Sequence, residues 1–109
     1  MLCFLTVRKL KPGAYEAFRE AWEPPDDAPE SFLGKFTRGY HLRNLEDENE
    51  VISFGFFEGN PKELDELRSD DAFRGAREQQ VERINEHVES LGTDAVFEVI
   101  EEVDFKALR

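Results

Sequence analysis

The chain has 109 residues, a formal net charge of −11 and ten phenylalanines, so we expect one domain, spanning residues 1–109, with a core that needs no metal or disulfide. The acidic excess disfavours nucleic acid and anionic membranes as partners, because phosphate groups are bound by clustered lysine and arginine. We interpret the acidic charge as a means of keeping the protein soluble, and the alternative is adaptation to a salt-rich host.

The N-terminal segment and the single cysteine together predict a cytoplasmic protein. Cys3 cannot form an internal disulfide and lies in an apolar run, which is typical of a reducing compartment. That run is too short for the apolar region of a signal peptide, and the basic residues follow it rather than precede it. No stretch of the sequence approaches the apolar length that a membrane span requires.

The first third of the chain predicts a strand followed by a helix. Residues 2–8 are apolar almost without interruption, which favours a strand covered on both faces. Pro12 and Gly13 end it, and the apolar residues of 14–22 then form one broad helical stripe. The acidic, proline-rich segment 23–34 is predicted to be a mobile loop.

The middle of the chain predicts a β-hairpin. Residues 35–45 and 50–58 are rich in aromatic and β-branched side chains, which favour strands. The polar residues between them predict a turn at 46–49. Alternate residues of each strand should therefore point to opposite faces of a sheet.

Two helix starts follow the hairpin. Asn60, with proline and glutamate after it, predicts a capped short helix over 61–67. Asp70 and its neighbours predict a second start and a long helix that ends at Gly92. The apolar stripe of this long helix would consist of Phe73, Ala76, Val81, Ile84, Val88 and Leu91.

A last strand is predicted over 95–105, which completes the order β-α-β-β-α-β. This order is typical of the ferredoxin-like α+β fold, a four-stranded antiparallel sheet with both helices on one face. The opposite face would then expose a large apolar patch, which monomeric proteins avoid. We therefore expect a homodimer in which two such faces meet.

Three segments carry a resemblance to a known family. They are VRKLKPGAYEAF at 7–18, GYHLRNLEDENEVISFGFFEG at 39–59 and ELRSDDAFRGAREQQ at 66–80. With them the chain resembles the antibiotic biosynthesis monooxygenase (ABM)-like family of dimeric α/β-barrel proteins. The resemblance implies a dimeric barrel and, as one activity within the family, oxidation of an aromatic, phenol-like substrate without a cofactor. The substrate's own anion would supply the electrons to oxygen.

The resemblance does not extend to the haem-degrading branch of the family. The position of its haem-ligating histidine is occupied here by Arg77, that of its tryptophan by Glu66 or Leu67, and that of its asparagine by Thr6 or Arg8. Haem degradation is therefore not expected.

Two further family positions lie at the end of the third strand. A tryptophan frequent there appears as Phe57, and a glutamate two residues earlier appears as Gly55. Any role of that glutamate cannot be transferred to this chain.

The hairpin register predicts a candidate site. The turn would set Leu45 opposite Glu50 or Val51. With Val51, the pairs on one face are His41 with Gly55, Arg43 with Ser53, and Gly39 with Phe57. The other face would carry Tyr40, Leu42, Ile52, Phe54 and Phe56. The first face combines a histidine and an arginine with small residues, as a small-molecule pocket requires.

His41 is the candidate catalytic residue, as a proton carrier or polar anchor. The alternative is a hydrogen-bonded histidine in the dimer interface. The residues predicted to bind substrate are Tyr15, Trp22, Arg43, Ser53, Gly55 and Phe57. For Tyr15 and Trp22, which could form flat aromatic walls, the alternative is ordinary core packing.

Other polar residues carry weaker hypotheses. Arg38, Arg43 and Arg77 could bind an anionic ligand through paired hydrogen bonds, although salt bridges are the commoner use in so acidic a chain. His87 is interpreted as a boundary residue beside the helical stripe. The histidines, the cysteine and the carboxylates lack metal-ligand spacing, so no metal and no cofactor are expected.

Two functional hypotheses follow. In the first, a homodimeric α/β-barrel protein binds a small apolar or aromatic molecule, with cofactor-free monooxygenase activity as one outcome. In the second, a non-catalytic dimer has a structural or accessory role and its interior is filled by phenylalanine and tyrosine. Side-chain packing beside His41 and Trp22 distinguishes the two.

Overall fold

A computed structural model describes residues 1–24, 30 and 34–108 of the chain. Its elements in chain order are β1 (Leu2–Leu10), α1 (Tyr15–Trp22), β2 (Phe36–Asn44), β3 (Asp47–Phe57), α3 (Pro61–Arg68), α4 (Asp71–Asn85), β4 (Val88–Glu98) and the 3-10 helix η1 (Phe105–Leu108). The predicted order of strands and helices is therefore confirmed. The predicted mobile loop at 23–34 lies largely outside the described residues.

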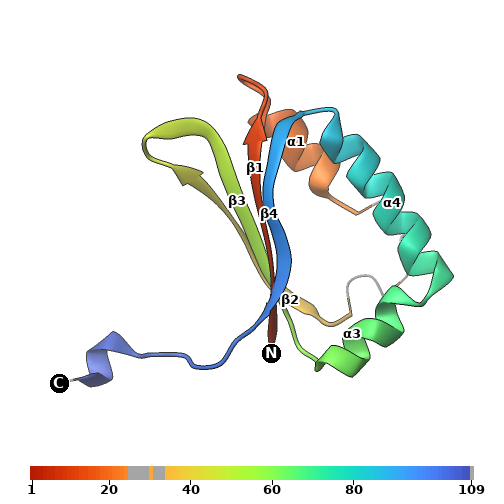
Figure 1. The fold of residues 1–109 in the computed structure, drawn as a ribbon, viewed down its shortest axis with the longest axis vertical. Coiled ribbons are helices and arrows are strands. Elements are labelled where there is room, and N and C mark those ends of the chain that lie inside the picture. The colour runs from red at the N-terminus through yellow and green to blue at the C-terminus, as the bar shows by residue number, and fades with distance from the viewer. Residues whose placement is uncertain (25–29, 31–33, 109) are drawn as a thin grey trace.

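The four strands form one antiparallel sheet in the order β2-β3-β1-β4. Helices α1, α3 and α4 lie together on one side of this sheet (Figure 1). The predicted ferredoxin-like α+β fold is thus confirmed. None of the helices in the described ranges is long and apolar enough to cross a membrane.

Both predicted helix starts after the hairpin are present. The Asn60 side chain accepts a hydrogen bond from the Glu63 amide at 2.8 Å, and the Glu63 carboxylate accepts one from the Asn60 amide at 3.2 Å. This reciprocal capping box opens α3. Asp70 caps α4 by accepting from the amide of Ala72 at 3.3 Å.

The hairpin turn is tighter than predicted. It comprises Leu45 and Glu46 rather than 46–49, because the Asn44 side chain accepts a hydrogen bond from the Glu46 amide at 2.8 Å. The observed pairs are Gly39 with Gly55, His41 with Ser53, and Arg43 with Val51. The predicted pairs were therefore wrong by two residues. Because two residues is one period of a strand, each side chain still lies on its predicted face.

The long helix ends earlier than predicted. It stops at Asn85, and Val88 already belongs to β4, where it pairs with Leu10. The prediction that Val88, Leu91 and Gly92 complete the helix was wrong, and His87 lies in the turn between α4 and β4. Val88 and Leu91 continue the helical spacing of apolar residues by coincidence, so periodicity alone could not show the end of the helix.

The last strand is correspondingly displaced, from the predicted 95–105 to Val88–Glu98. Its N-terminal half consists mainly of polar, exposed residues, as suits the edge of a sheet. Glu98 pairs with Leu2 at the start of β1, so later residues find no neighbouring strand within the described chain. The segment after Val99 extends away from the helices (Figure 1).

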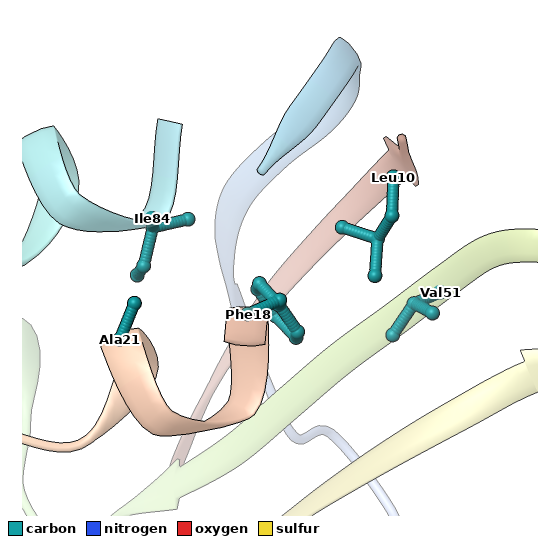
Figure 2. Close-up of a cluster of buried hydrophobic side chains, with 5 residues drawn as sticks. All are labelled: Leu10, Phe18, Ala21, Val51 and Ile84. Carbon is teal, nitrogen blue, oxygen red and sulfur yellow. The ribbon is translucent and has the colours of Figure 1, made fainter. Parts of the chain in front are cut away.

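The core between sheet and helices consists of two separate clusters. The first contains Leu10, Phe18, Ala21, Val51 and Ile84 (Figure 2). The second contains Leu2, Phe57 and Leu64, with Phe4 and Phe36 packed against it. Leu2 and Leu10 are the two ends of β1, so the clusters lie at opposite ends of the helix-covered layer.

Candidate ligand cavity

The residues between the two clusters are polar although they are buried. Along β1 the inward positions alternate, and Thr6 and Arg8 fall between the apolar ends of the strand. Ser53 occupies the equivalent position on β3, opposite Thr6. These three side chains are only 8%, 6% and 6% exposed. The middle of the layer therefore contains buried side chains that are not apolar.

A cavity of about 800 Å³ opens at this position. Its apolar wall includes Phe4, Trp22, Phe36, Phe73, Val81 and Val96. Its polar wall includes Thr6, Arg8, Ser53, Arg77, Gln80 and Asp94. A concave, largely aromatic space with a few convergent polar groups is the usual form of a small-molecule site.

Arg8 places a guanidinium group in this wall. Its Nη1 donates to the Ser53 hydroxyl at 3.5 Å, and its Cζ lies 5.3 Å from the centre of the Phe18 ring. Burial lowers the pKa of Arg8, the nearby charge of Arg77 lowers it further, and Asp94 opposes the change. Arg8 remains charged at neutral pH, since the ordinary pKa of arginine is far above it.

Arg77 reaches the cavity from α4 and is held by a buried glutamine. Its Nη1 donates to Gln80 Oε1 at 2.7 Å. Gln80, which is 4% exposed, also donates through Nε2 to the carbonyl oxygen of Trp22. The glutamine thus connects α4 to the end of α1 and fixes the position of Arg77 between them.

His41 lies beside the cavity rather than in its wall. Its Nδ1 is 2.8 Å from the Ser53 hydroxyl, and its ring is 4.6 Å from that of Trp22 between centroids. Both of these neighbours line the cavity. Burial lowers the pKa of His41, and the charges of Arg19 and Arg8 act in the same direction. The imidazole is therefore neutral at neutral pH and able to accept a proton.

The structure brings three of the predicted substrate-binding residues into the cavity wall, namely Trp22, Ser53 and Gly55. The other three lie elsewhere. Tyr15 packs on His41 with ring centroids 6.2 Å apart, and the exposed Arg43 lies 5.3 Å from the Tyr15 ring. Phe57 is fully buried in the second core cluster.

Sequence reasoning did not single out Arg8, Gln80 or Asp94 as ligand-binding candidates. A signal for Arg8 exists, because an arginine at an inward position of an otherwise apolar strand needs a polar environment. Gln80 sits on the apolar face of α4, where a polar residue is equally unusual. Asp94 carried no such signal, since it fell between the end of the predicted long helix at Gly92 and the strand predicted over 95–105.

No group of three or more histidine, cysteine or acidic side chains converges within the described residues to hold a metal ion. Neither His41 nor His87 is among the residues that line the cavity.

No protein-family model matches the sequence. No curated protein matches it either.

Solved structures match over nearly the whole chain. SnoaB from Streptomyces nogalater, described as a cofactor-independent oxygenase, has a TM-score of 0.63 at 12% identity and covers 94% of this chain and 95% of its own. An antibiotic biosynthesis monooxygenase has a TM-score of 0.58 at 18% identity, covering 93% and 100%. A NIPSNAP domain protein from Burkholderia xenovorans has a TM-score of 0.58 at 12% identity, covering 95% and 100%. These matches show the fold alone, because the identities are so low.

Proposed function

We propose that this chain, which has the fold of the antibiotic biosynthesis monooxygenase-like proteins, binds an aromatic small molecule in its cavity as a cytoplasmic homodimer. The observation that carries the proposal is the cavity of about 800 Å³ between two filled core clusters. Its volume lies within the range of drug-sized ligand sites. The alternative of an interior filled by phenylalanine and tyrosine is disfavoured by this space.

Aromatic rings around the cavity support a flat, multi-ring ligand. Phe4 and Phe36 form a tilted pair with ring centroids 5.2 Å apart on one side, and Trp22 stands on another. Aromatic rings attract one another in stacked and edge-to-face arrangements. A phenol-like polycyclic compound would match both these surfaces and the hydroxyl groups of Thr6 and Ser53.

Cofactor-free monooxygenation is the activity we propose to test in this site. A phenol-bearing substrate with an acidic methylene group would lose a proton and donate electrons to O2. One oxygen atom would replace the two methylene hydrogens as a carbonyl, and the other would leave with those hydrogens as water. The protein would supply orientation, exclusion of water and a base. The neutral His41 would act through the Ser53 hydroxyl that separates it from the cavity.

The uncovered face of the sheet supports the proposed dimer. Tyr40, Leu42 and Phe97 are 43%, 45% and 48% exposed there, and Tyr40 stacks on Phe54 with centroids 5.0 Å apart. A second copy of the chain would cover this apolar surface with an identical one, as two-fold symmetry allows. The apolar residues beyond Val99, including Ile100 at 90% exposure, would gain a surface to contact in the same assembly.

Native mass spectrometry of freshly purified protein tests both parts of this proposal. We expect the mass of two chains, with a small-molecule adduct in part of the sample. Leu42→Glu should shift the protein towards monomer, since it places a charge in the proposed interface. A wild-type protein that remains monomeric at all concentrations would refute the dimer.

Oxygen consumption with a hydroxyanthrone, a tricyclic phenol with an acidic methylene group, tests the activity. If the protein is an oxygenase, oxygen consumption should exceed the spontaneous rate, and the rate should be strongly reduced in His41→Ala. Binding of the compound without accelerated uptake would leave a binding protein and refute the oxygenase.

A further inference from the structure

Two arginines in the cavity wall have no carboxylate partner within the part of the chain that the structure describes. Arg8 and Arg77 both line the cavity, yet neither has a carboxylate oxygen within 4.0 Å among the described residues. The chain carries 25 acidic residues against 14 basic ones, so partners are abundant in its composition. Two unpaired guanidinium groups in one buried wall therefore require an explanation.

We propose that Arg8 and Arg77 bind the carboxylate group of the aromatic ligand. This inference rests on the proposed function, because it names the charged group of a molecule whose rings would occupy the same cavity. It assigns the polar end of the ligand to the end of the cavity formed by β1 and α4.

The first step is the cost of leaving these charges unpaired. A buried guanidinium group is unfavourable unless hydrogen-bond acceptors replace the lost water. Arg8 has one long hydrogen bond, at 3.5 Å to Ser53, and Arg77 has one to Gln80 at 2.7 Å. Each guanidinium group has five N–H donors. No fully buried side-chain nitrogen of the described residues lacks a partner, so the guanidinium nitrogens of both arginines that make no hydrogen bond are not sealed in the interior, and both side chains line the cavity.

The second step is geometry. Arg77 is held in place by Gln80, which is itself fixed on the carbonyl oxygen of Trp22. Arg8 is held against the Phe18 ring, 5.3 Å from its centre. Two guanidinium groups in fixed positions suit the planar, two-oxygen carboxylate better than a single hydroxyl does. Prior positioning of these side chains also reduces the entropy lost on binding.

The third step is charge. Asp94 lies in the same wall, where its carboxylate accepts a hydrogen bond from Thr6 at 3.1 Å. Arg8, Arg77 and this aspartate together carry one net positive charge, and the described residues of the whole cavity wall carry a larger one. An anionic group on the ligand would reduce this positive charge, and a carboxylate would do so with two planar oxygens that match guanidinium groups. The predicted ligand is therefore an aromatic carboxylate.

Among the described residues, five arginines line the cavity together with two acidic residues, Glu78 and Asp94, in a chain whose net charge is −11. Arg38, Arg68 and Arg74 are the exposed members of this set. A local positive potential on an acidic protein favours the approach of anions to this site over the rest of the surface.

A matched pair of fluorescent probes tests the inference. Anthracenecarboxylate and anthracenemethanol share the same ring system and differ in charge. Their dissociation constants should be measured by fluorescence titration for the wild type, Arg77→Gln, Arg8→Gln and the control Arg83→Gln. Arg83 is an exposed arginine on the same helix as Arg77. Circular dichroism confirms that each variant is folded before it is titrated.

We expect the carboxylate to bind the wild type at least about tenfold more tightly than the alcohol, equivalent to about 1.4 kcal/mol. Arg77→Gln should remove most of this difference and leave binding of the alcohol within about twofold, because only charge-assisted hydrogen bonds are lost. Arg8→Gln should act in the same direction, and Arg83→Gln should change neither constant.

The possible failures are distinguishable. Equal affinity of the wild type for both probes, or a full carboxylate preference in a folded Arg77→Gln, would refute the anion subsite and leave the cavity as a neutral aromatic site. Binding of neither probe would refute the proposed function and, with it, this inference.

Discussion

The end and the middle of the helix-covered layer are built by the same strands and have opposite characters. At the end, Leu10 and Val51 pack with Phe18, and all three are almost completely buried. Two residues along each strand, the next inward positions are Arg8 and Ser53, which are buried to nearly the same degree. The end is filled with apolar side chains, whereas the middle is polar and borders a cavity of about 800 Å³.

This difference shows that burial alone does not identify the structural core. Polar groups in a protein interior reduce stability unless each is satisfied, and a cavity forgoes packing contacts. The apolar end therefore stabilises the fold. The middle contains polar groups and a cavity, neither of which is needed to stabilise it. The comparison predicts that substitutions at the apolar end mainly change the free energy of unfolding, whereas filling the cavity in the middle mainly changes ligand binding.

The largest expected effect is a loss of stability at the apolar end. Phe18→Ala removes a ring that is 0% exposed, which should lower the free energy of unfolding by about 3–5 kcal/mol. Urea denaturation measures this change directly. Leu45→Ala is the control, because that side chain in the hairpin turn is 102% exposed and its loss should change stability by no more than about 0.5 kcal/mol. Equal effects at both positions would contradict the assignment of the core.

Filling the middle should abolish binding without unfolding the protein. A side chain at Gly39 would begin 3.7 Å from the Trp22 ring and 3.6 Å from the carbonyl oxygen of Phe54, which is ordinary contact. Gly39→Leu should extend into the cavity beside Trp22 and weaken anthracenemethanol binding by at least about tenfold, equivalent to about 1.4 kcal/mol.

Gly75→Leu provides the matched control for this substitution. A side chain added there meets nothing within 4 Å, so binding of the probe should be unchanged. If Gly39→Leu binds as tightly as the wild type, the ligand does not occupy this cavity.

Ser53→Ala should have a smaller effect on stability than any truncation at the apolar end. The hydroxyl contacts His41 Nδ1 at 2.8 Å and Arg8 Nη1 at 3.5 Å, and its loss should cost about 1 kcal/mol. Urea denaturation of Ser53→Ala and Phe18→Ala under the same conditions compares their free energies of unfolding directly. A loss as large as that of Phe18→Ala would mean that the polar middle is a principal source of stability.

The smallest expected effect is a dependence of stability on pH. Burial lowers the pKa of His41 in the folded protein below its ordinary value of 6.5. The unfolded chain therefore binds more protons at this residue as the pH falls below about 6.5, and the fold loses stability over that window down to the folded pKa.

His41→Gln isolates this contribution from that of the many carboxylates. Between about pH 7 and about pH 5, the wild type should lose more stability than the variant, as measured by urea midpoints. Identical pH profiles for the two proteins would show that His41 is not buried in its neutral form.

The sequence predicted the fold and the faces of the hairpin because these depend on strong local signals. The capping residues at Asn60 and Asp70 mark helix starts, and strand alternation fixes the face of His41 whether the register shifts by two residues or not. The edge strand β4 (Val88–Glu98) was misplaced, because polar residues at a sheet edge give little alternation and Val88 continues the helical spacing.

The cavity could be predicted only in part. Trp22, Ser53 and Gly55 were predicted to bind substrate, and these three residues line the cavity. Arg8 and Asp94 both line the cavity because β1 pairs with β4 in the sheet. This pairing joins segments far apart in the sequence, so no local sequence pattern predicts it. His41 was predicted as the catalytic residue, but Ser53 lies between it and the cavity. Strand alternation gives the face on which a side chain lies, not whether it borders the cavity or lies behind a neighbour.

Nuclear magnetic resonance titration with anthracenemethanol tests the central comparison most directly. The indole N–H of Trp22 and the amides of Thr6 and Ser53 should shift as the probe enters the cavity. The methyl groups of Leu10, Val51 and Ile84 should keep their positions, since the apolar end has no space for a ligand. Shifts confined to the apolar cluster or to the open face of the sheet would contradict a ligand site between the two core clusters.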